Sequence, residues 1–447
     1  MANKFHLTMI IAGAMTMISP TAFSAIKIQS WQTESGARVL FVENHTLPML
    51  DVAVDFAAGA AYDQPGESGL ANLTQRLLKL GAGGLSEGEI ARKLADVGAQ
   101  LDGRFDKDRA ALALRTLSSA RERDQALEVL ATVLQQPDFP EGVIAREKNR
   151  IVAGLKEAET RPESIAEKAF YSALYGAHPY ALHQSGEVAT VSQLSRADVK
   201  NFYDSRYHAN RAVVSLVGDV SRAQAEVITD RLTRDLPRWQ GESKMLPAVT
   251  PPTQREMHKI PHPATQSHIL IGYPAMERGD PDYFPLYVGN YILGGGGFVS
   301  RLTEEVREKR GLAYSVYSYF LPLQELGPFQ IGLQTKKEQS DQALKVVRDT
   351  LKKFVAQGPS ERELKAAKQN LIGGFPLRVD SNKEILDYLA MIGYYRLPLN
   401  YLDDFTKNVE KVTVAEIKDA FRRRINPDEL QTVIVGAGEK PRAAAGS

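Results

Sequence analysis

Four consecutive glycines and the segment after them are the residues of this sequence most able to let a ligand come close. The run is Gly294, Gly295, Gly296 and Gly297. Because glycine has no side chain, another backbone or a ligand can reach its N–H and C=O groups. The Lys-Ser/Thr pair of a phosphate-binding P-loop does not follow the run. Taken alone, the stretch fits a binding loop and an ordinary surface loop equally well.

The segment after the glycines is expected to form a short helix and then a strand. Ser300 offers an N-cap hydroxyl, and Leu302 and Val306 share one helical face at i, i+4 spacing. Gly311 can end this helix in the left-handed conformation. Residues 313–320 are rich in β-branched and aromatic side chains, which favours a strand.

Other constellations that carry chemistry are weak or missing. The chain has no cysteine, which excludes disulfides, thiolate metal sites and cysteine nucleophiles. The single G-x-S-x-G segment, residues 84–88 (GLSEG), contains Ser86, which is expected to start the next helix. Among the eight histidines are two closely spaced pairs, His178 with His183 and His258 with His262, and a proline interrupts each pair. Neither pair is therefore expected to share a helical face and hold a metal.

The elements that position these residues are typical of an α+β fold. In the first half, Leu70, Leu73 and Leu77 recur at helical spacing behind Ser68, a suitable N-cap. Further helices are expected at residues 86–97, 120–136, 139–159 and 221–236. Runs of apolar or alternating residues predict strands at residues 38–42, 50–56, 99–105, 110–117 and 212–218.

The second half repeats this plan. Strands are expected at residues 268–273, 329–334 and 430–436, and helices at residues 281–293, 340–357, 360–372, 383–395 and 413–421. The segments AVVSLVG and LQTVIVG hold matching places near the ends of the two halves, which indicates a duplicated domain. Residues 237–263 contain six prolines and are expected to link a domain at 26–236 to one at 264–447.

Composition and charge limit the classes of function that the chain can have. A length of 447 residues favours two or more domains, and a formal net charge of +1 gives no support to nucleic acid as a partner. Residues 1–25 combine a positive start, an apolar run and small residues at the end, typical of a cleaved signal peptide. The apolar run is short for a membrane span. Export to a bacterial periplasm is therefore expected, with a retained N-terminal anchor as the alternative.

Three stretches together resemble the pitrilysin/insulinase superfamily of zinc peptidases, in the two-domain form of the mitochondrial processing peptidase. They are AAGAAYDQPGESGLANLTQRLLKLGAGGLS, HPYALHQSGEVATVSQLSRADVKNFYDSRYHANRAVVSLVGDV and VGNYILGGGGFVSRLTEEVREKRGLAYSVYS. The resemblance covers nearly the whole chain after residue 25. It implies two homologous domains, each an antiparallel-rich sheet packed with helices, that form half of a clamshell.

The zinc motif of that family, H-x-x-E-H, is replaced here. Catalytic members use two histidines as zinc ligands and the glutamate to activate water. Asn72, Gln75 and Arg76 occupy those positions. Asparagine is a poor zinc ligand, glutamine cannot accept a proton from water, and arginine stays cationic and repels a dication. Ala153-Gly154 stand where the family's downstream acidic pair is expected, so we expect no zinc in this chain.

The resemblance also implies a surviving role for an Arg and a Tyr in R-x(6)-Y. Arg307 and Tyr314 match this spacing. In the family the pair comes from the C-terminal domain, faces the zinc across the chamber and stabilises the scissile carbonyl, a role suited to fixed guanidinium and phenol donors. The glycines at 294–297 are expected to give a peptide backbone room.

The leading hypothesis is a non-catalytic, substrate-binding subunit of a periplasmic heterodimeric zinc metallopeptidase that degrades peptides. Its partner is expected to be a homologous subunit that bears H-x-x-E-H and holds the zinc, and the chain alone is expected to be inactive. A peptide-binding or assembly scaffold without a hydrolytic role, like the related core subunits of respiratory complexes, is the alternative. A self-sufficient peptidase with rebuilt metal ligands is a third, weaker hypothesis.

Overall fold

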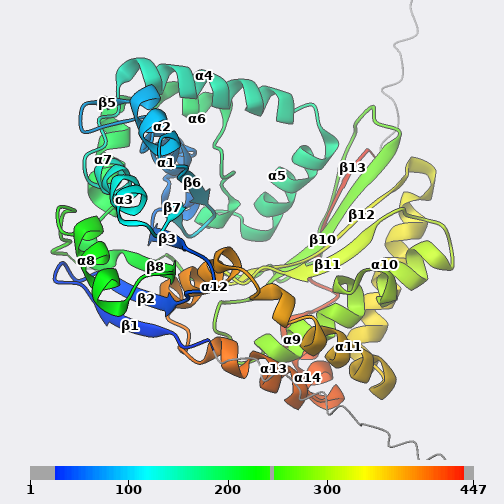
Figure 1. Ribbon diagram of the computed structural model, residues 1–447. Helices are drawn as coiled ribbons and strands as arrows, with labels where there is room; N and C mark the ends of the chain where they lie inside the picture. Colours follow the sequence, from blue (N-terminus) through cyan, green and yellow to red (C-terminus); the bar gives the residue numbers. More distant parts are fainter. Residues whose placement is uncertain (1–25, 242–245, 437–447) are drawn as a thin grey trace, which may run out of the picture.

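Two mixed sheets, one in each half of the chain, organise the molecule (Figure 1). The computed structural model describes residues 26–241 and 246–436, so the expected signal peptide lies outside the described residues. The first sheet has the order β1-β2-β8-β3-β7-β6. Its strands are β1 (Gln29–Gln32), β2 (Arg38–Glu43), β3 (Met49–Phe56), β6 (Gln100–Phe105), β7 (Ala110–Leu117) and β8 (Val213–Gly218). A small hairpin, β4 (Gly81–Ala82) with β5 (Leu85–Ser86), stands apart.

The second sheet repeats this arrangement. Its order is β11-β12-β10-β13-β9. The strands are β9 (Met257–Ile260), β10 (Gln266–Met276), β11 (Val316–Phe320), β12 (Gly327–Lys336) and β13 (Gln431–Val435). In each sheet one pair is parallel, β2 with β8 and β13 with β9, and the other neighbours are antiparallel. The predicted duplication and the antiparallel-rich α+β class are therefore confirmed.

Helices cover both sheets. The first half contains α1 (Leu70–Leu77), α2 (Glu87–Ala95), α3 (Ala120–Gln135), α4 (Glu141–Ala158), α5 (Pro162–Tyr175), α6 (Val188–Gln193), α7 (Arg196–Arg206) and α8 (Arg222–Thr233). The second half contains α9 (Tyr283–Asn290), α10 (Ser340–Gln357), α11 (Glu361–Gly373), α12 (Asn382–Tyr394), α13 (Tyr401–Lys411) and α14 (Val414–Arg424). Ser86, Ser221 and Ser360 each open a helix with a capping box, which explains why the helices start there. Among the described residues no helix is both long and apolar enough to cross a membrane.

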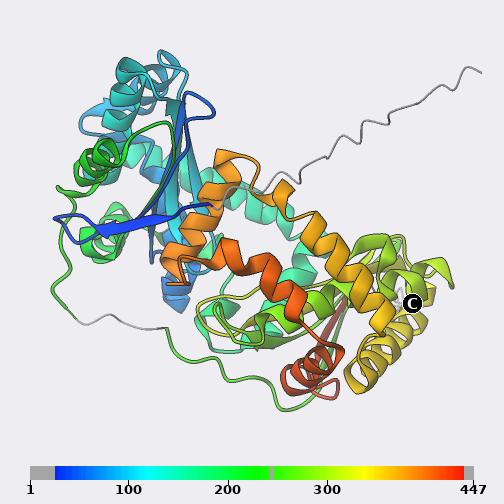
Figure 2. The ribbon, with the colours of Figure 1, turned by 60° about the horizontal axis from the view of Figure 1, so that its bottom comes forward.

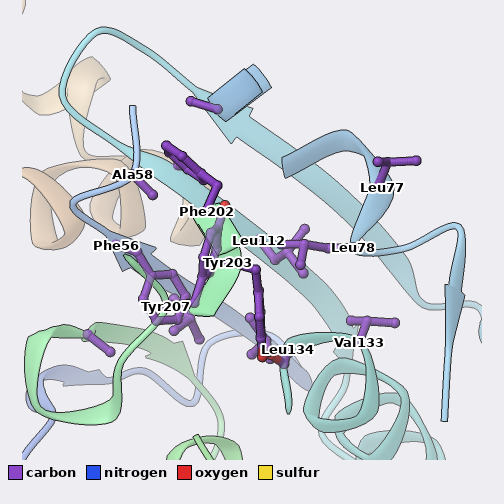
Figure 3. Close-up of a cluster of buried hydrophobic side chains, with 14 of the residues drawn as sticks. Phe56, Ala58, Leu77, Leu78, Leu112, Val133, Leu134, Phe202, Tyr203 and Tyr207 are labelled. Atoms are coloured by element: carbon purple, nitrogen blue, oxygen red, sulfur yellow. Dashed lines mark hydrogen bonds between the residues drawn. The ribbon is translucent and has the colours of Figure 1, made fainter. Parts of the chain in front are cut away.

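Alternate residues of the strands face two different cores. In β2, Val39 and Phe41 face a core built with the first-half helices, whereas Leu40 and Val42 face a core shared with the second half. The first core is centred on aromatic rings: Phe56 and Tyr207 have ring centres 4.7 Å apart (Figure 3). The first sheet is thus buried on both faces, which accounts for its long apolar runs.

Local structure departs from the sequence expectations around the glycine run. After α9, residues Tyr291–Gly295 and Thr303–Glu308 adopt wider π-type turns, and Gly297–Val299 forms a 3-10 turn. The helix expected after Ser300 is therefore irregular. Gly311 ends it with φ of 62°, as predicted.

The connection between the halves is partly built into the fold. Residues 257–260, within the stretch expected to be a linker, form β9 at the edge of the second sheet. Leu246 and Val249 are buried against the first-half core. Figure 2 shows the green connecting segment running beside the two halves, and the orange helices of the second half reaching the blue strands of the first.

Candidate functional site

Helix α1 holds the positions of the altered zinc motif. Its start is fixed by Asp63, whose carboxylate accepts the N–H groups of Gly69 and Ala71, each at 2.8 Å. Burial nevertheless raises the pKa of Asp63 to about 7. Leu73 and Leu77 are fully buried, so the apolar face of the helix lies inward as predicted.

Gln75 is tied to the sheet behind α1. Its side chain is 5% exposed and its Nε2 donates to the carbonyl of Ala111 in β7 at 3.2 Å. The same amide lies against Gly103 of edge strand β6, where an added Cβ would come 2.9 Å from the amide carbon of Gln75. Gln75 therefore fills the space between helix and strand and has no acid–base chemistry to offer.

Arg76 pairs with a carboxylate that the sequence analysis did not single out. Arg76 Nη2 lies 3.0 Å from Glu147 Oε2 in α4, and Glu147 is buried. Arg146 approaches the other oxygen of Glu147 at 3.5 Å. The expected acidic position was placed at Ala153-Gly154, about two turns further along α4. Only the buried face of α4, seen in the structure, identifies Glu147 as the residue that meets α1.

Zinc does not fit this set of side chains. Asn72 is half-buried beside a guanidinium that already carries the positive charge at this site. Neither an asparagine amide nor a guanidinium cation is a suitable ligand for Zn²⁺. Within residues 26–241 and 246–436, no three His, Asp or Glu side chains lie close enough together to hold a metal ion.

The glycine run has two roles in the structure. Gly294 is buried, and an added Cβ would collide with Ser318 Oγ and lie 2.7 Å from the Ser318 nitrogen in β11. Gly295 and Gly296 pack closely on Asn290 and Tyr291. Gly297 has φ of 61° and open space around it. The first three glycines are thus required by packing, and the last by the turn.

Arg307 and Tyr314 are brought together on the surface. The guanidinium carbon of Arg307 lies 5.1 Å from the centre of the Tyr314 ring. It also lies 4.8 Å from the ring centre of Phe298, which directly follows the glycines. Tyr314 is 83% exposed and Phe298 is 73% exposed. Phe298 was not among the predicted site residues; its only sequence signal is an aromatic residue that follows a glycine loop.

The altered zinc helix and the Arg307–Tyr314 pair stay separate within this chain. The first lies in α1 of the first half and the second precedes β11 of the second half. In the part of the chain that the structure describes, no hydrogen bond or ion pair joins the two sets.

Comparison with known proteins agrees with the resemblance. The family model described as Insulinase (Peptidase family M16) matches residues 38–187, and the model described as Peptidase M16 inactive domain matches residues 193–371. A crystal structure of the peptidase M16 inactive domain from Pseudomonas fluorescens is similar, with a TM-score of 0.89 and 38% identity. That match covers 92% of this chain and 98% of the other.

Two curated relatives are similar over nearly their whole length. The non-peptidase homolog YmxG of Helicobacter pylori is 26% identical, over 98% of this chain and 99% of the relative. The uncharacterized zinc protease YmxG of Bacillus subtilis is 24% identical, over 93% of this chain and 100% of the relative. The chain therefore belongs to peptidase family M16, the insulinase family, as a member without the zinc-binding motif.

Proposed function

We propose that this chain is the non-catalytic, substrate-binding subunit of a heterodimeric zinc metallopeptidase that degrades peptides. The observation that carries the proposal is the contact between Arg307 and Tyr314 on an exposed surface, in a chain whose own zinc helix is altered. A homologous subunit with H-x-x-E-H would hold the zinc. The two chains would enclose a chamber, each forming one half of a clamshell.

The exposed pair suits the recognition of a peptide carbonyl. A guanidinium presents several fixed N–H donors and a phenol adds one O–H donor, and such donors stabilise oxygen that gains negative charge. The Arg307 guanidinium contacts the rings of Phe298 and Tyr314 and lies 3.4 Å from Glu308 Oε1, contacts that favour one placement of its donors. Zinc in the partner would supply a Lewis acid; the residues of this chain would bind and orient the substrate.

The neighbouring strand supports a role in holding peptide. β11 begins two residues after Tyr314 and is the edge strand of its sheet, a position where an extended peptide can add by backbone hydrogen bonds, although the Ser318 carbonyl already accepts Asn290 Nδ2 at 3.0 Å. A cavity of about 330 Å³ lies beside it, between α5 and the sheet. Its lining includes Glu163, Glu167, Tyr317 and Tyr319. An extended peptide paired with β11 would have room there for a side chain.

The periplasm is the proposed compartment. Its support is the composition of residues 1–25, which resembles a cleaved signal peptide. An assembly scaffold, the alternative, has no evident need for an exposed Arg–Tyr pair, so we favour the peptidase subunit.

Reconstitution tests the proposal. The purified chain is assayed on unstructured peptides alone and together with an H-x-x-E-H relative from the same organism, and the zinc content of each preparation is measured. We expect no zinc and no cleavage for the chain alone, and zinc-dependent cleavage by a complex of the two. Cleavage by the relative that does not change when this chain is added would contradict the proposal.

A further inference from the structure

The two halves of this chain exchange helices. α5 of the first half packs on β10 and β13 of the second sheet, and α12 of the second half packs on β2, β3 and β8 of the first (Figure 1). Both contacts are close. A Cβ added at Gly272 would lie 2.5 Å from the Phe170 ring of α5, and one added at Gly393 of α12 would lie 2.5 Å from Val213. Neither helix can slide far without a clash.

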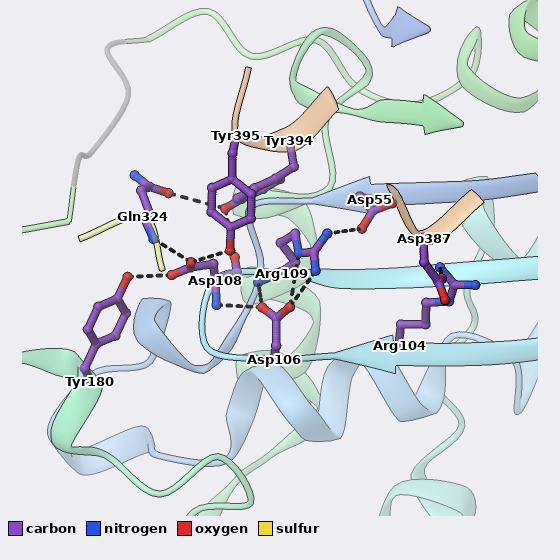
Figure 4. Close-up of polar contacts among 10 residues, drawn as sticks. All are labelled: Asp55, Arg104, Asp106, Asp108, Arg109, Tyr180, Gln324, Asp387, Tyr394 and Tyr395. Carbon is purple, nitrogen blue, oxygen red and sulfur yellow. Dashed lines mark hydrogen bonds and ion pairs between the residues drawn. The ribbon is translucent and has the colours of Figure 1, made fainter. Parts of the chain in front are cut away.

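A buried carboxylate lies where the two halves meet. Asp108, in the turn between β6 and β7, is 0% exposed. It accepts hydrogen bonds from Tyr180 Oη at 2.6 Å, Tyr395 Oη at 2.7 Å and the Gln324 backbone N–H at 2.8 Å (Figure 4). Tyr394 Oη donates to the Asp108 carbonyl at 3.0 Å. The Gly59 N–H also donates to this carbonyl, at 3.2 Å, so Asp108 receives three donors from the second half and two from its own.

The network requires a carboxylate at this position. Tyr180 Oη accepts the Glu325 N–H at 3.1 Å, so its own proton is directed at Asp108. An asparagine would turn an NH₂ group toward at least one of these donors and leave it without an acceptor. Because Asp108 is fully buried, water cannot readily replace a hydrogen bond lost at this site, and the same burial raises the pKa of its carboxyl group.

The same turn holds a second set of contacts around the junction. Arg109 binds Asp106 at 2.9 Å and lies 5.6 Å from the ring centres of Tyr394 and Tyr395 (Figure 4). Arg104 pairs with Asp387 of α12 at 2.5 Å. Ion pairs and aromatic contacts thus flank the buried carboxylate on the α12 side.

From the helix exchange and this network we infer that Asp108 is a positioning residue that locks the two halves of the chain into one rigid body. The second half, with Arg307 and Tyr314, is then held at a fixed distance and angle from the first. Opening of any two-chain assembly must occur between chains and not within this one. The inference concerns the isolated chain and does not depend on the proposed peptidase role.

Distance measurement between the halves tests the inference. Because the chain has no cysteine, spin labels attach only to introduced cysteines. Suitable sites are Val227→Cys in α8, where the valine is 70% exposed, and Lys345→Cys in α10, where the lysine side chain is 76% exposed. In this labelled parent, double electron–electron resonance is expected to give one narrow distance. Asp108→Asn and Tyr395→Phe are each expected to broaden this distance distribution or to add a second, longer distance.

A matched control separates positioning from general stability. Tyr203→Phe removes an equally short buried hydrogen bond, 2.6 Å to the Leu134 carbonyl, within the first half alone. It is expected to lower the melting temperature and keep the narrow distance. If Asp108→Asn does not fold, Tyr395→Phe, which removes one donor of three, decides. A folded variant of either kind with the parent distance, or a broad distance in the parent, would overturn the inference.

Discussion

Arg76 and Glu147 are joined across α1 and α4 by an ion pair of 3.0 Å, and the Glu147 side chain is only 5% exposed. At the positions where the resemblance implies zinc ligands, a cation meets a buried carboxylate. The ion pair joins α1 to α4 at the positions where the zinc ligands are missing. Removing Arg76 would leave the buried carboxylate with only its longer contact to Arg146, at 3.5 Å.

Arg76→Ala is therefore expected to lower the free energy of unfolding by about 2 kcal/mol, below the cost of a fully buried pair because Arg76 is partly exposed. Urea unfolding measures this. Lys345→Ala serves as the control, since its pair with Asp349 is on the surface and is expected to contribute less than about 0.5 kcal/mol. Equal losses in the two variants would show that the Arg76–Glu147 pair has no special structural weight.

Asp55 makes the stability of the folded protein depend on pH. It is buried in β3, its Oδ2 has no hydrogen-bond partner among the described residues, and Arg109 lies 3.5 Å from its other oxygen. Burial raises its pKa to about 6. Because the folded value exceeds the ordinary value near 3.9, this group's contribution to stability is complete below about pH 4 and is lost as pH rises through 6.

Asp55→Asn, which is neutral at every pH, is expected to remove that dependence. Relative to the variant, the parent should lose about 2 kcal/mol of unfolding free energy between pH 4 and pH 7.5 through this group. Urea unfolding of both proteins across this range measures the difference. A difference that does not change with pH would show that Asp55 is ionised in the folded protein throughout.

The sequence identified the site residues unevenly, for physical reasons. Arg307, Tyr314 and the altered positions 72, 75 and 76 were recognised because their spacing within one local segment is fixed. Glu147 and Phe298 were missed, since each acts through a contact that depends on how a helix or turn is rotated. Asp108 was missed because its partners come from distant segments, 180, 324 and 395.

At the scale of elements, the glycine run packs against the second sheet at its start and leads into an exposed turn at its end. Gly294 packs against Ser318 of β11, which brings the segment before Phe298 close to this strand. Helices and strands themselves were largely predictable, because caps and apolar periodicity mark them locally. The π-type turns at Tyr291–Gly295 and Thr303–Glu308 were not predicted, because local propensity does not distinguish them from an ordinary helix; the first of them includes Gly294, which packs against β11.

Gly294→Ala is expected to destabilise the protein by about 1–3 kcal/mol, because its Cβ would collide with Ser318 in β11. Gly154→Ala is the matched control: it lies inside α4 with nothing within 4 Å of the added Cβ. The control is expected to gain about 0.5–1 kcal/mol from better helix propensity. Thermal or urea unfolding measures both, and a stabilising Gly294→Ala would contradict the packing role of that glycine.

At the scale of the whole molecule, the two halves share a fold but carry different site residues. Apart from β1, which has no counterpart, the strands of the two sheets follow the same order with the same single parallel pair. Only the first half contains the zinc-motif position, and only the second contains the exposed Arg–Tyr pair. The two-domain plan was predictable from repeated patterns. The exchange of α5 and α12 was not, because helical periodicity does not say which sheet a helix covers.

The most direct test of the proposed function is the kinetics of peptide cleavage by the complex with an H-x-x-E-H partner, using Arg307→Ala and Tyr314→Phe in this chain. Both variants are expected to lower kcat/KM by about 10²-fold or more, in line with the loss of donors to a developing oxyanion. Arg310→Ala, which removes a nearby guanidinium paired with Glu305, is expected to leave it unchanged. Unchanged cleavage with both Arg307 and Tyr314 replaced would contradict the account.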